Sequence, residues 1–488
     1  MNRRDFLRLS AVAAGSAVVH PQGMLSLAKR DDSNPQGSLL ETAPSDSPID
    51  TVVVVMLENR SVDHYLGWLG TDERYRERGR RRYGRRFHVD GRVDVSYLNL
   101  EGHEVTAAPL VSNPKFPNPW RGCGHPVPGH GWFAGREQLT KGFLAPRTGN
   151  DEYAIGYYRG EDLPFYAKLA NRFTICDHHF ASLMGPTFPN RQYLHSAQSG
   201  GERDDPIPIR SAQWNTETIE DRLLEKHVSV GYFYVDLPIL LLWGERFKRV
   251  IAPVDTFFER CDEGRLPRVS FIDPGFGGDL RTDEHSYGDI RLGQRFVREI
   301  FKAFVNSKHW KSGLFILTYD EWGGFFDHVR PPLLPDDRAV PDIEFSFGLA
   351  GFRVPSFIAS PYAARNFADH RIYDHTSILR FLEWRFLGAP AEGPGGKKAR
   401  WFLTKRDRSA LNIGASLGNS NPNPDVEGLF GLPHFTSTPA CAPENVPHPV
   451  QPPDGHDNPF QFHESLEELL LSDYPKARHR SWEELAGV

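Results

Sequence analysis

The chain has 488 residues, of which 39% are hydrophobic and 12% are aromatic, and it carries a formal net charge of −6. A chain of this length buries a sizeable core, so we expect a large globular protein. The small negative charge provides no overall attraction to nucleic acid or to an anionic membrane, and we expect no nucleic-acid partner.

The first 28 residues have the features of an export signal. Residues 2–8 (NRRDFLR) resemble a twin-arginine motif, a mildly apolar stretch follows over residues 9–19, and small residues surround a cleavage position near Ala28. The apolar stretch is shorter than the ~20 residues that a membrane span needs. We expect residues 1–28 to be a signal peptide for the twin-arginine export machinery, with a disordered basic tail as the alternative. A flexible leader over residues 29–48 would follow, and the mature protein would be periplasmic, secreted or held at the cell surface.

A β-branched run over residues 51–57 predicts the first strand of a parallel sheet, because strands buried on both faces lack polar positions. Glu58 and Asn59 follow this strand directly. Ligands gather at the carboxyl ends of parallel strands, and oxygen-bearing side chains there suit a hard cation. Residues 59–61 also fit a helix N-cap, and one loop can serve both purposes.

Two stretches after this junction have a strongly biased amino-acid composition. Residues 74–86 contain eight arginines, and residues 88–150 are rich in Pro, Gly and His. We interpret the second stretch as an elaborated loop region that forms a wall of the site and contributes His130. The arginine run has two interpretations: a basic loop that contacts lipid headgroups or a phosphorylated substrate, or a solvated, mobile surface.

Thr187 is the candidate nucleophile. Prolines on both sides restrict its backbone, and Asn190 and Arg191 follow within one helical turn. A rigid hydroxyl beside an arginine suits attack on a phosphoryl group, because a guanidinium matches phosphate oxygens bidentately. The alternative is a purely structural Pro-rich turn.

The middle of the chain predicts further elements of an α/β fold. Apolar runs predict strands at residues 230–234, 269–272, 314–317 and 354–358, although a proline lowers the expectation for the last of these. Hydrophobic spacing over residues 292–305 predicts an amphipathic helix.

The end of the strand at residues 314–317 is the most informative junction. Asp320 and Glu321 follow it, and paired glycines and His328 come next. Two adjacent carboxylates on a glycine-rich loop suit a hard metal ion, although the same pattern also fits a polar turn. Two further histidines have polar company: His285 lies in an Asp-Glu-His cluster, and His375 follows an aspartate and precedes a helical pattern.

After residue 390, the hydrophobic pattern that predicts helices and strands becomes weak. Residues 415–460 predict an extended arm, and residues 465–471 predict a short terminal helix. Because no Cys-x-x-Cys pair is present, a structural zinc site is not expected, and the four cysteines allow at most two disulfides in one of three pairings. These residues are Cys123, Cys176, Cys261 and Cys441.

Five colinear stretches together resemble the phosphoesterase family of bacterial phospholipases C, plant non-specific phospholipases C and some bacterial acid phosphatases. The resemblance extends over roughly residues 48–390, and the matching stretches are residues 58–67, 184–191, 283–286, 319–328 and 374–383. It implies a three-layer αβα fold like that of alkaline phosphatase, with a mostly parallel central sheet and loop insertions. The catalytic domain would span residues 49–390, and residues 391–488 would be an extension that packs on the core or trails from it.

The resemblance also implies roles for individual residues. A divalent metal ion would be held by Glu58, Asn59, Thr187, Asp320 and Glu321, and these hard ligands favour calcium, magnesium or manganese over zinc or iron. Thr187 would be the nucleophile, with His130, His285, His375 and Arg191 as further catalytic candidates. Substrate contacts would come from His64, Asn190 and His328.

The function that follows is an exported, metal-dependent phosphoesterase. We expect a phospholipase C that releases diacylglycerol and a phosphorylated headgroup through a phosphothreonine intermediate. The alternative is a broad-specificity acid phosphatase with the same site. A secreted binding protein with a degenerate site is disfavoured, because Glu58, Asn59, Thr187, Asp320 and Glu321 are all intact.

Overall fold

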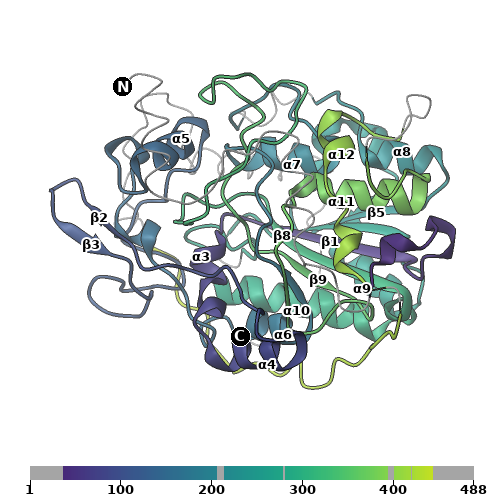
Figure 1. Cartoon of the computed structure of the whole chain (residues 1–488), viewed down its shortest axis with the longest axis horizontal. Helices are drawn as coiled ribbons and strands as arrows, with labels where there is room; N and C mark the ends of the chain where they lie inside the picture. Colours follow the sequence, from purple (N-terminus) through teal and green to yellow (C-terminus); the bar gives the residue numbers. More distant parts are fainter. Residues whose placement is uncertain (1–36, 206–213, 279–280, 394–400, 419, 443–488) are drawn as a thin grey trace. The chain divides into compact units, whose positions relative to one another are not determined.

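A computed structural model describes residues 37–205, 214–278, 281–393, 401–418 and 420–442 (Figure 1). The predicted signal peptide and the predicted terminal helix at residues 465–471 lie outside the described residues, as does the second half of the predicted arm.

An eight-stranded sheet forms the centre of the fold, in the order β10-β4-β9-β8-β1-β7-β5-β6. Every strand runs parallel to its neighbours except β9, which is antiparallel to β4 and β8. The strands are β1 (Thr51–Leu57), β4 (Thr174–Cys176), β5 (Val230–Tyr234), β6 (Ile251–Pro253), β7 (Val269–Asp273), β8 (Gly313–Tyr319), β9 (Phe357–Ala359) and β10 (Phe367–Asp369). All residues of β1 and β8 are buried, as expected for strands covered on both faces.

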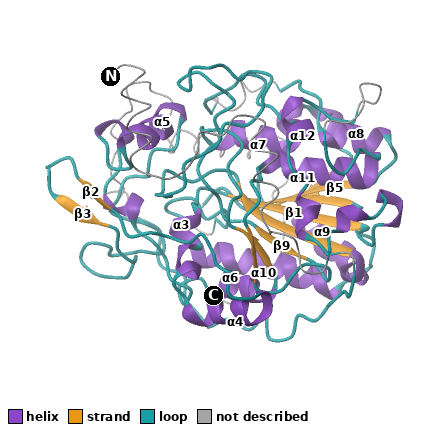
Figure 2. Cartoon of the chain, viewed as in Figure 1, coloured by secondary structure: helices purple, strands orange, loops and turns teal. Residues whose placement is uncertain are grey.

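Helices cover both faces of this sheet (Figure 2). One layer is formed by α6 (Pro164–Arg172), α9 (Val254–Asp262) and α10 (Ile290–Asn306), and the other by α7 (Thr187–Ser196), α8 (Ile219–Glu225), α11 (His375–Leu382) and α12 (Lys405–Ser409). The predicted three-layer α/β class with a mostly parallel sheet is thereby confirmed. Among the described residues, the structure contains no helix with the length and apolar character of a membrane span.

The strand predicted at residues 354–358 is present in the central sheet, but it begins later than predicted. β9 begins only at Phe357 and runs against its neighbours. Pro355 has no backbone N–H to donate to a ladder, so the residues before it run outside the strand.

The loop prediction for residues 88–150 is also partly wrong. This stretch contains a hairpin of β2 (Ser96–Leu98) and β3 (Glu104–Thr106) and the ten-residue helix α5 (Trp132–Lys141). Buried polar side chains in α5, among them Arg136 and Gln138, obscured its helical pattern, because the buried face is not apolar.

The arginine run forms a helix rather than a loop. α4 (Glu73–Tyr83) begins at the N-cap Asp72, whose carboxylate accepts from the Tyr75 backbone N–H at 2.8 Å. Tyr75 and Gly79 are its buried positions, and a Cβ on Gly79 would overlap the Phe87 ring. Only Gly permits that contact, so the helix is ordered by packing in spite of its like charges.

The predicted flexible leader is ordered where it is described. Residues 37–48 include two short 3-10 helices, Leu39–Glu41 and Pro44–Asp46. Leu39 is fully buried, and its backbone N–H donates to the Leu417 carbonyl at 2.8 Å. One apolar residue in a polar stretch thus ties this segment to the core.

The C-terminal segment also joins the core. Ile413 and Leu417 are fully buried. Cys123 and Cys441 form a disulfide that closes a separation of 318 residues, and Cys176 and Cys261 are buried free thiols.

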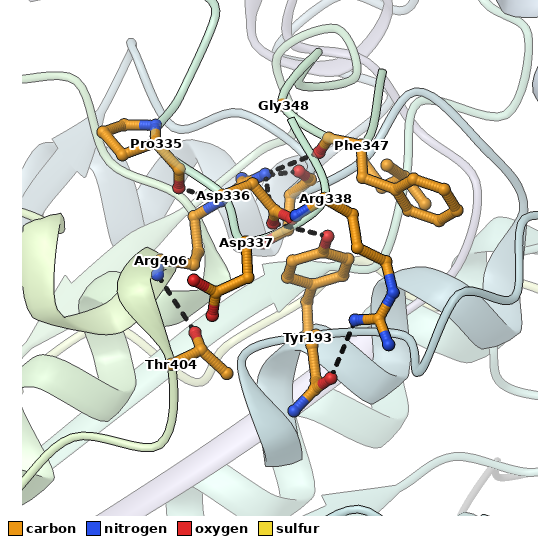
Figure 3. Close-up of polar contacts among 12 residues, drawn as sticks. Tyr193, Pro335, Asp336, Asp337, Arg338, Phe347, Gly348, Thr404 and Arg406 are labelled. Carbon is orange, nitrogen blue, oxygen red and sulfur yellow. Dashed lines mark hydrogen bonds and ion pairs between the residues drawn. The ribbon is translucent and has the colours of Figure 1, made fainter. Parts of the chain in front are cut away.

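Arg406 is the main polar anchor of this segment, and Figure 3 shows it among the polar contacts of Asp336 and Tyr193. It is only 2% exposed. Its guanidinium donates to the Ser182 carbonyl at 2.8 Å and pairs with Asp374 at 3.2 Å and Asp336 at 3.1 Å. The Tyr193 hydroxyl of α7 donates to the same Asp336 carboxylate at 2.8 Å. The guanidinium also donates to the carbonyls of Pro335 and Phe347. Arg406 therefore joins the loop before Thr187, helix α7 and the cap of α11.

We predict that Arg406→Met lowers the free energy of unfolding by about 3–5 kcal/mol, because it leaves buried Asp336 and Asp374 without their cation. Urea denaturation measures this change. The matched control is Arg408→Met, at an exposed position of the same helix, and it should change stability by less than about 0.5 kcal/mol. Equal effects of the two variants would contradict the anchoring role.

Candidate active site

Two neighbouring strand ends bring four polar side chains together. β1 and β8 pair in register from Thr51↔Gly313 to Leu57↔Tyr319, so the residues that follow them are adjacent. The Asn59 backbone N–H donates to the Asp320 carboxylate at 3.2 Å. The side chains of Glu58, Asn59, Asp320 and Glu321 are all buried.

The paired glycines after Glu321 allow this close approach. Gly323 has φ of 66°, and a Cβ there would lie 2.3 Å from the Asn59 carbonyl oxygen. Gly324 has φ of 70°, and a Cβ there would lie 2.5 Å from the Gly129 carbonyl oxygen. These two glycines let the β8 loop touch both the β1 loop and the loop that carries His130.

Four oxygen atoms in this cluster have no hydrogen-bond partner within the described residues. They are Glu58 Oε2, Asn59 Oδ1, Asp320 Oδ2 and Glu321 Oε1. Buried acceptors without donors are costly, and carboxylate and amide oxygens are the ligand type that a hard divalent cation takes. The residues therefore fit a metal ion, with Thr187 as a further oxygen beside them.

The electrostatics of the cluster support the same interpretation. Burial raises the pKa of Asp320 to about 6, against the opposing effect of Arg191. Burial and the neighbouring Asp320 carboxylate raise the pKa values of Glu58 and Glu321 well above the ordinary range. A bound cation would return all three carboxyls to their charged form.

Arg191 lies against these carboxylates. Its guanidinium pairs with Glu58 at 3.2 Å, Asp273 at 3.1 Å and Asp320 at 3.5 Å. The side chain is 2% exposed. Protein carboxylates thus engage the guanidinium of Arg191, and its predicted catalytic role stays a prediction.

Thr187 is the first residue of α7, and its hydroxyl is close enough to Asp320 to act on the pKa of that carboxyl. Asn190 shapes the loop before it. The Asn190 amide accepts from the Leu183 N–H at 2.9 Å and donates to the Gly185 carbonyl at 2.8 Å. Both ends of this amide are used by backbone, so the structure gives no support to the predicted substrate contact of Asn190.

His130 and His285 lie together at the cluster, with ring centroids 5.9 Å apart. The His130 Nδ1 donates to the Pro128 carbonyl at 2.8 Å, so Nε2 is the acceptor and lies 3.4 Å from the Asn59 amide nitrogen. Burial lowers the pKa of His130 and keeps it neutral. The loop of His285 is held against Glu58, whose N–H donates to the Asp283 carbonyl at 2.9 Å.

His375 is fully buried. Its Nε2 donates to the Asp320 backbone carbonyl at 2.7 Å, and burial lowers its pKa to about 4. A neutral imidazole in this place holds the Asp320 backbone. The predicted catalytic role of His375 stays a prediction.

His64 and His328 use both ring nitrogens within the protein. His64 contacts the Gly156 carbonyl at 2.7 Å and Arg60 at 3.0 Å. His328 contacts Asp63 at 2.7 Å and Asp90 at 3.1 Å. The predicted substrate contacts of His64 and His328 therefore gain no support from the geometry.

Asp63, Asp327 and His328 form a second group with the spacing of metal ligands. Arg353 already occupies it, at 2.9 Å from Asp63 and 2.8 Å from Asp327. Although burial opposes its charged form, hydrogen bonds to Asp63 and Asp90 raise the pKa of His328 to about 10. In this structure the three side chains thus form an ion-pair network with Arg353.

Asp273, the third partner of Arg191, was missed in the sequence. It is the last residue of β7, directly after the run predicted at residues 269–272. The same signal that identified Asp320, an acid at the end of a buried strand, could have found it. Arg353 carried no comparable signal, because its partners are distant in sequence.

Comparison with known proteins gives the family. A model of the Phosphoesterase family matches residues 49–387. Non-specific phospholipase C5 of Arabidopsis thaliana is 30% identical over 79% of this chain and 77% of its own length. Non-specific phospholipase C1 of the same plant is 32% identical over 74% of this chain and 69% of its own length. Phospholipase C B of Mycobacterium tuberculosis is 28% identical over 91% and 92%.

A solved structure of a protein in the alkaline phosphatase superfamily from Vibrio parahaemolyticus covers 75% of each chain at 12% identity, with a TM-score of 0.31. The sheet order and the family match carry more weight than a likeness of that size. The chain is a hydrolase with an α/β fold that acts on phosphoric ester bonds. The chain belongs to the Phosphoesterase family, as its sequence motifs predicted.

We predict a pH-dependent effect of His328→Gln on stability. His328 has a folded pKa of about 10, above its unfolded value near ~6.5, so its contribution is full below the unfolded value and disappears as pH rises to the folded one. The difference in free energy of unfolding between wild type and variant should therefore shrink steadily over that interval. Urea denaturation at several pH values measures it. His103→Gln, with a side chain 74% exposed, is the control, and a difference that grows with pH would contradict the network.

Proposed function

We propose that the protein is a metal-dependent phospholipase C that cleaves the glycerol side of a phospholipid phosphodiester. The observation that carries the proposal is a set of four buried oxygens next to Thr187, from Glu58, Asn59, Asp320 and Glu321, that lack a hydrogen-bond partner among the described residues. Only the Asp320 oxygen has an ion-pair partner in the described part of the chain, Arg191 at 3.5 Å. Support also comes from relatives named phospholipases C in plants and bacteria.

A divalent ion bound by these residues would supply Lewis-acid stabilisation of negative charge on the reacting oxygens. Thr187 attacks phosphorus in line through its hydroxyl oxygen. Its place at the first position of α7 favours negative charge there, because the helix N-terminus carries a positive partial charge. Diacylglycerol leaves, and the phosphorylated headgroup stays on Thr187 as a phosphodiester.

His130 and His285 are the candidates for proton transfer. The fixed Nδ1 proton of His130 leaves Nε2 as the basic atom. One of these imidazoles takes the hydroxyl proton of Thr187 as it attacks and passes it to the departing glycerol oxygen. In the second step the same imidazole takes a proton from the water that cleaves phosphothreonine and returns it to the Thr187 oxygen. Arg191, Asn190 and His375 act by holding Glu58, Asp320 and the Thr187 loop in place.

The proposal includes export. The twin-arginine motif at residues 2–8 supports delivery of the folded protein to the periplasm, the cell surface or the medium. The substrate would there be the phospholipid of a membrane or of a lipid aggregate.

Thr187→Ala should lower turnover by at least ~100- to 1000-fold, because the nucleophilic oxygen is lost. Its thermal midpoint should remain close to that of the wild type. Release of para-nitrophenol from para-nitrophenyl phosphorylcholine measures turnover. The control Thr140→Ala, at an exposed position of α5, should retain activity. Wild-type turnover by the Thr187 variant would overturn the nucleophile assignment.

Chelation should abolish turnover, and re-addition of single divalent metals should restore it, with calcium, magnesium and manganese tested before zinc and iron. We expect para-nitrophenyl phosphorylcholine to be preferred over para-nitrophenyl phosphate, and diacylglycerol to be released from phosphatidylcholine. Preference for the monoester would make the protein an acid phosphatase with the same site. Activity that survives chelation would exclude the metal.

A further inference from the structure

The exposed apolar side chains of this protein are not scattered. Among the described residues, all large hydrophobics with high exposure except Leu411 belong to two segments, residues 93–111 and residues 333–345. Leu98 and Leu100 are the most exposed of them, at 66% and 63%. Single exposed apolar residues are ordinary, but their concentration in two segments indicates an interaction surface.

Leu98 and Leu100 form the tip of the β2–β3 hairpin, which lies at the left edge of the molecule in Figure 1, away from the central sheet. The turn is held rigidly by Asn99, whose side-chain oxygen accepts from the N–H groups of Glu101 at 3.1 Å and His103 at 2.9 Å. A tight turn that presents two leucines to solvent has no role in the core of the protein.

The base of the hairpin packs beside the active site. Tyr97 points inward, and its ring lies 6.1 Å from the Phe326 ring. Phe326 belongs to a buried apolar cluster that also contains Trp322 and Met184. Trp322 directly follows Glu321, and Met184 lies three residues before Thr187. The other exposed segment reaches the same cluster through Ile343.

The charges around the tip select the kind of surface it fits. Glu101 and Glu104 flank the leucines, and both side chains are exposed. An anionic membrane would repel these carboxylates, whereas a zwitterionic surface would not. This distinguishes the tip from the arginine-rich helix α4, which would favour anionic lipid.

We propose that the β2–β3 hairpin tip, with Leu98 and Leu100, inserts into a zwitterionic phospholipid surface and so places the active site against the headgroups. The inference deepens the proposed function and rests on it for the identity of the lipid. Leucine side chains that leave water for the acyl boundary drive this docking. The exposed residues of the second segment, Leu333, Val340 and Phe345, would lie at the rim of the contact.

Co-sedimentation with phosphatidylcholine vesicles tests the inference. All proteins carry Thr187→Ala, so that lipid is not consumed. Leu98→Ser with Leu100→Ser should weaken vesicle binding by about tenfold or more, since each leucine contributes free energy on leaving water. Leu411→Ser, which changes an exposed leucine outside the two segments, should bind like the parent. Leu98→Phe with Leu100→Phe should retain binding.

The outcomes separate this inference from the proposed function. In the active background, the double serine variant should keep its turnover of para-nitrophenyl phosphorylcholine, which shows that the site is folded. Unchanged vesicle binding by the double serine variant would contradict insertion of the hairpin tip into the lipid surface. The inference would also be contradicted if the Thr187→Ala parent did not bind the vesicles. The same holds if the parent bound only anionic vesicles and salt abolished that binding. If the parent were a dimer and the double serine variant a monomer, the tip would bind a second copy of the chain instead of lipid. Vesicle binding without any release of diacylglycerol in the active background would refute the proposed function. It would still agree with insertion of the hairpin tip.

Discussion

The in-register pairing of β1 with β8 is the constraint on which the rest of the site depends. It places Glu58 and Asn59 beside Asp320 and Glu321 at one edge of the sheet. Three carboxylates in a buried volume repel one another and lose hydration, so the apo arrangement is expensive. A bound cation would offset both costs and would stabilise this edge of the sheet.

The surrounding residues support that cluster in a second layer. Arg191 compensates part of the negative charge and is itself held by Asp273. His375 holds the Asp320 backbone, and Asn190 holds the loop that leads to Thr187. Arg406 ties this layer to the C-terminal segment, so residues far from residue 320 in the chain stabilise its surroundings. Such a layer keeps catalytic groups in place without touching the substrate.

The histidines show where sequence reasoning reached its limit. An imidazole near a motif serves equally as proton carrier, structural donor or cation, and its partners decide which. His130 keeps a basic nitrogen at the cluster. His375 is neutral and bonded to a backbone carbonyl, whereas His328 is held as a cation between Asp63 and Asp90. In the sequence, all three histidines are simply imidazoles near polar motifs. Only their contacts in the folded protein distinguish their roles.

The sequence by itself determined the α/β class, the strands β1, β5, β7 and β8, and the acids at two of their ends. These features are local, because a strand buried on both faces must be apolar throughout and a polar residue marks its end. The motif order also determined the family. Tertiary structure decided the antiparallel β9, the helix within the arginine run, the partners of Arg191 and the network of Arg353. Each of these depends on contacts between residues distant in the chain, and a pattern of neighbours carries no record of which distant groups will meet.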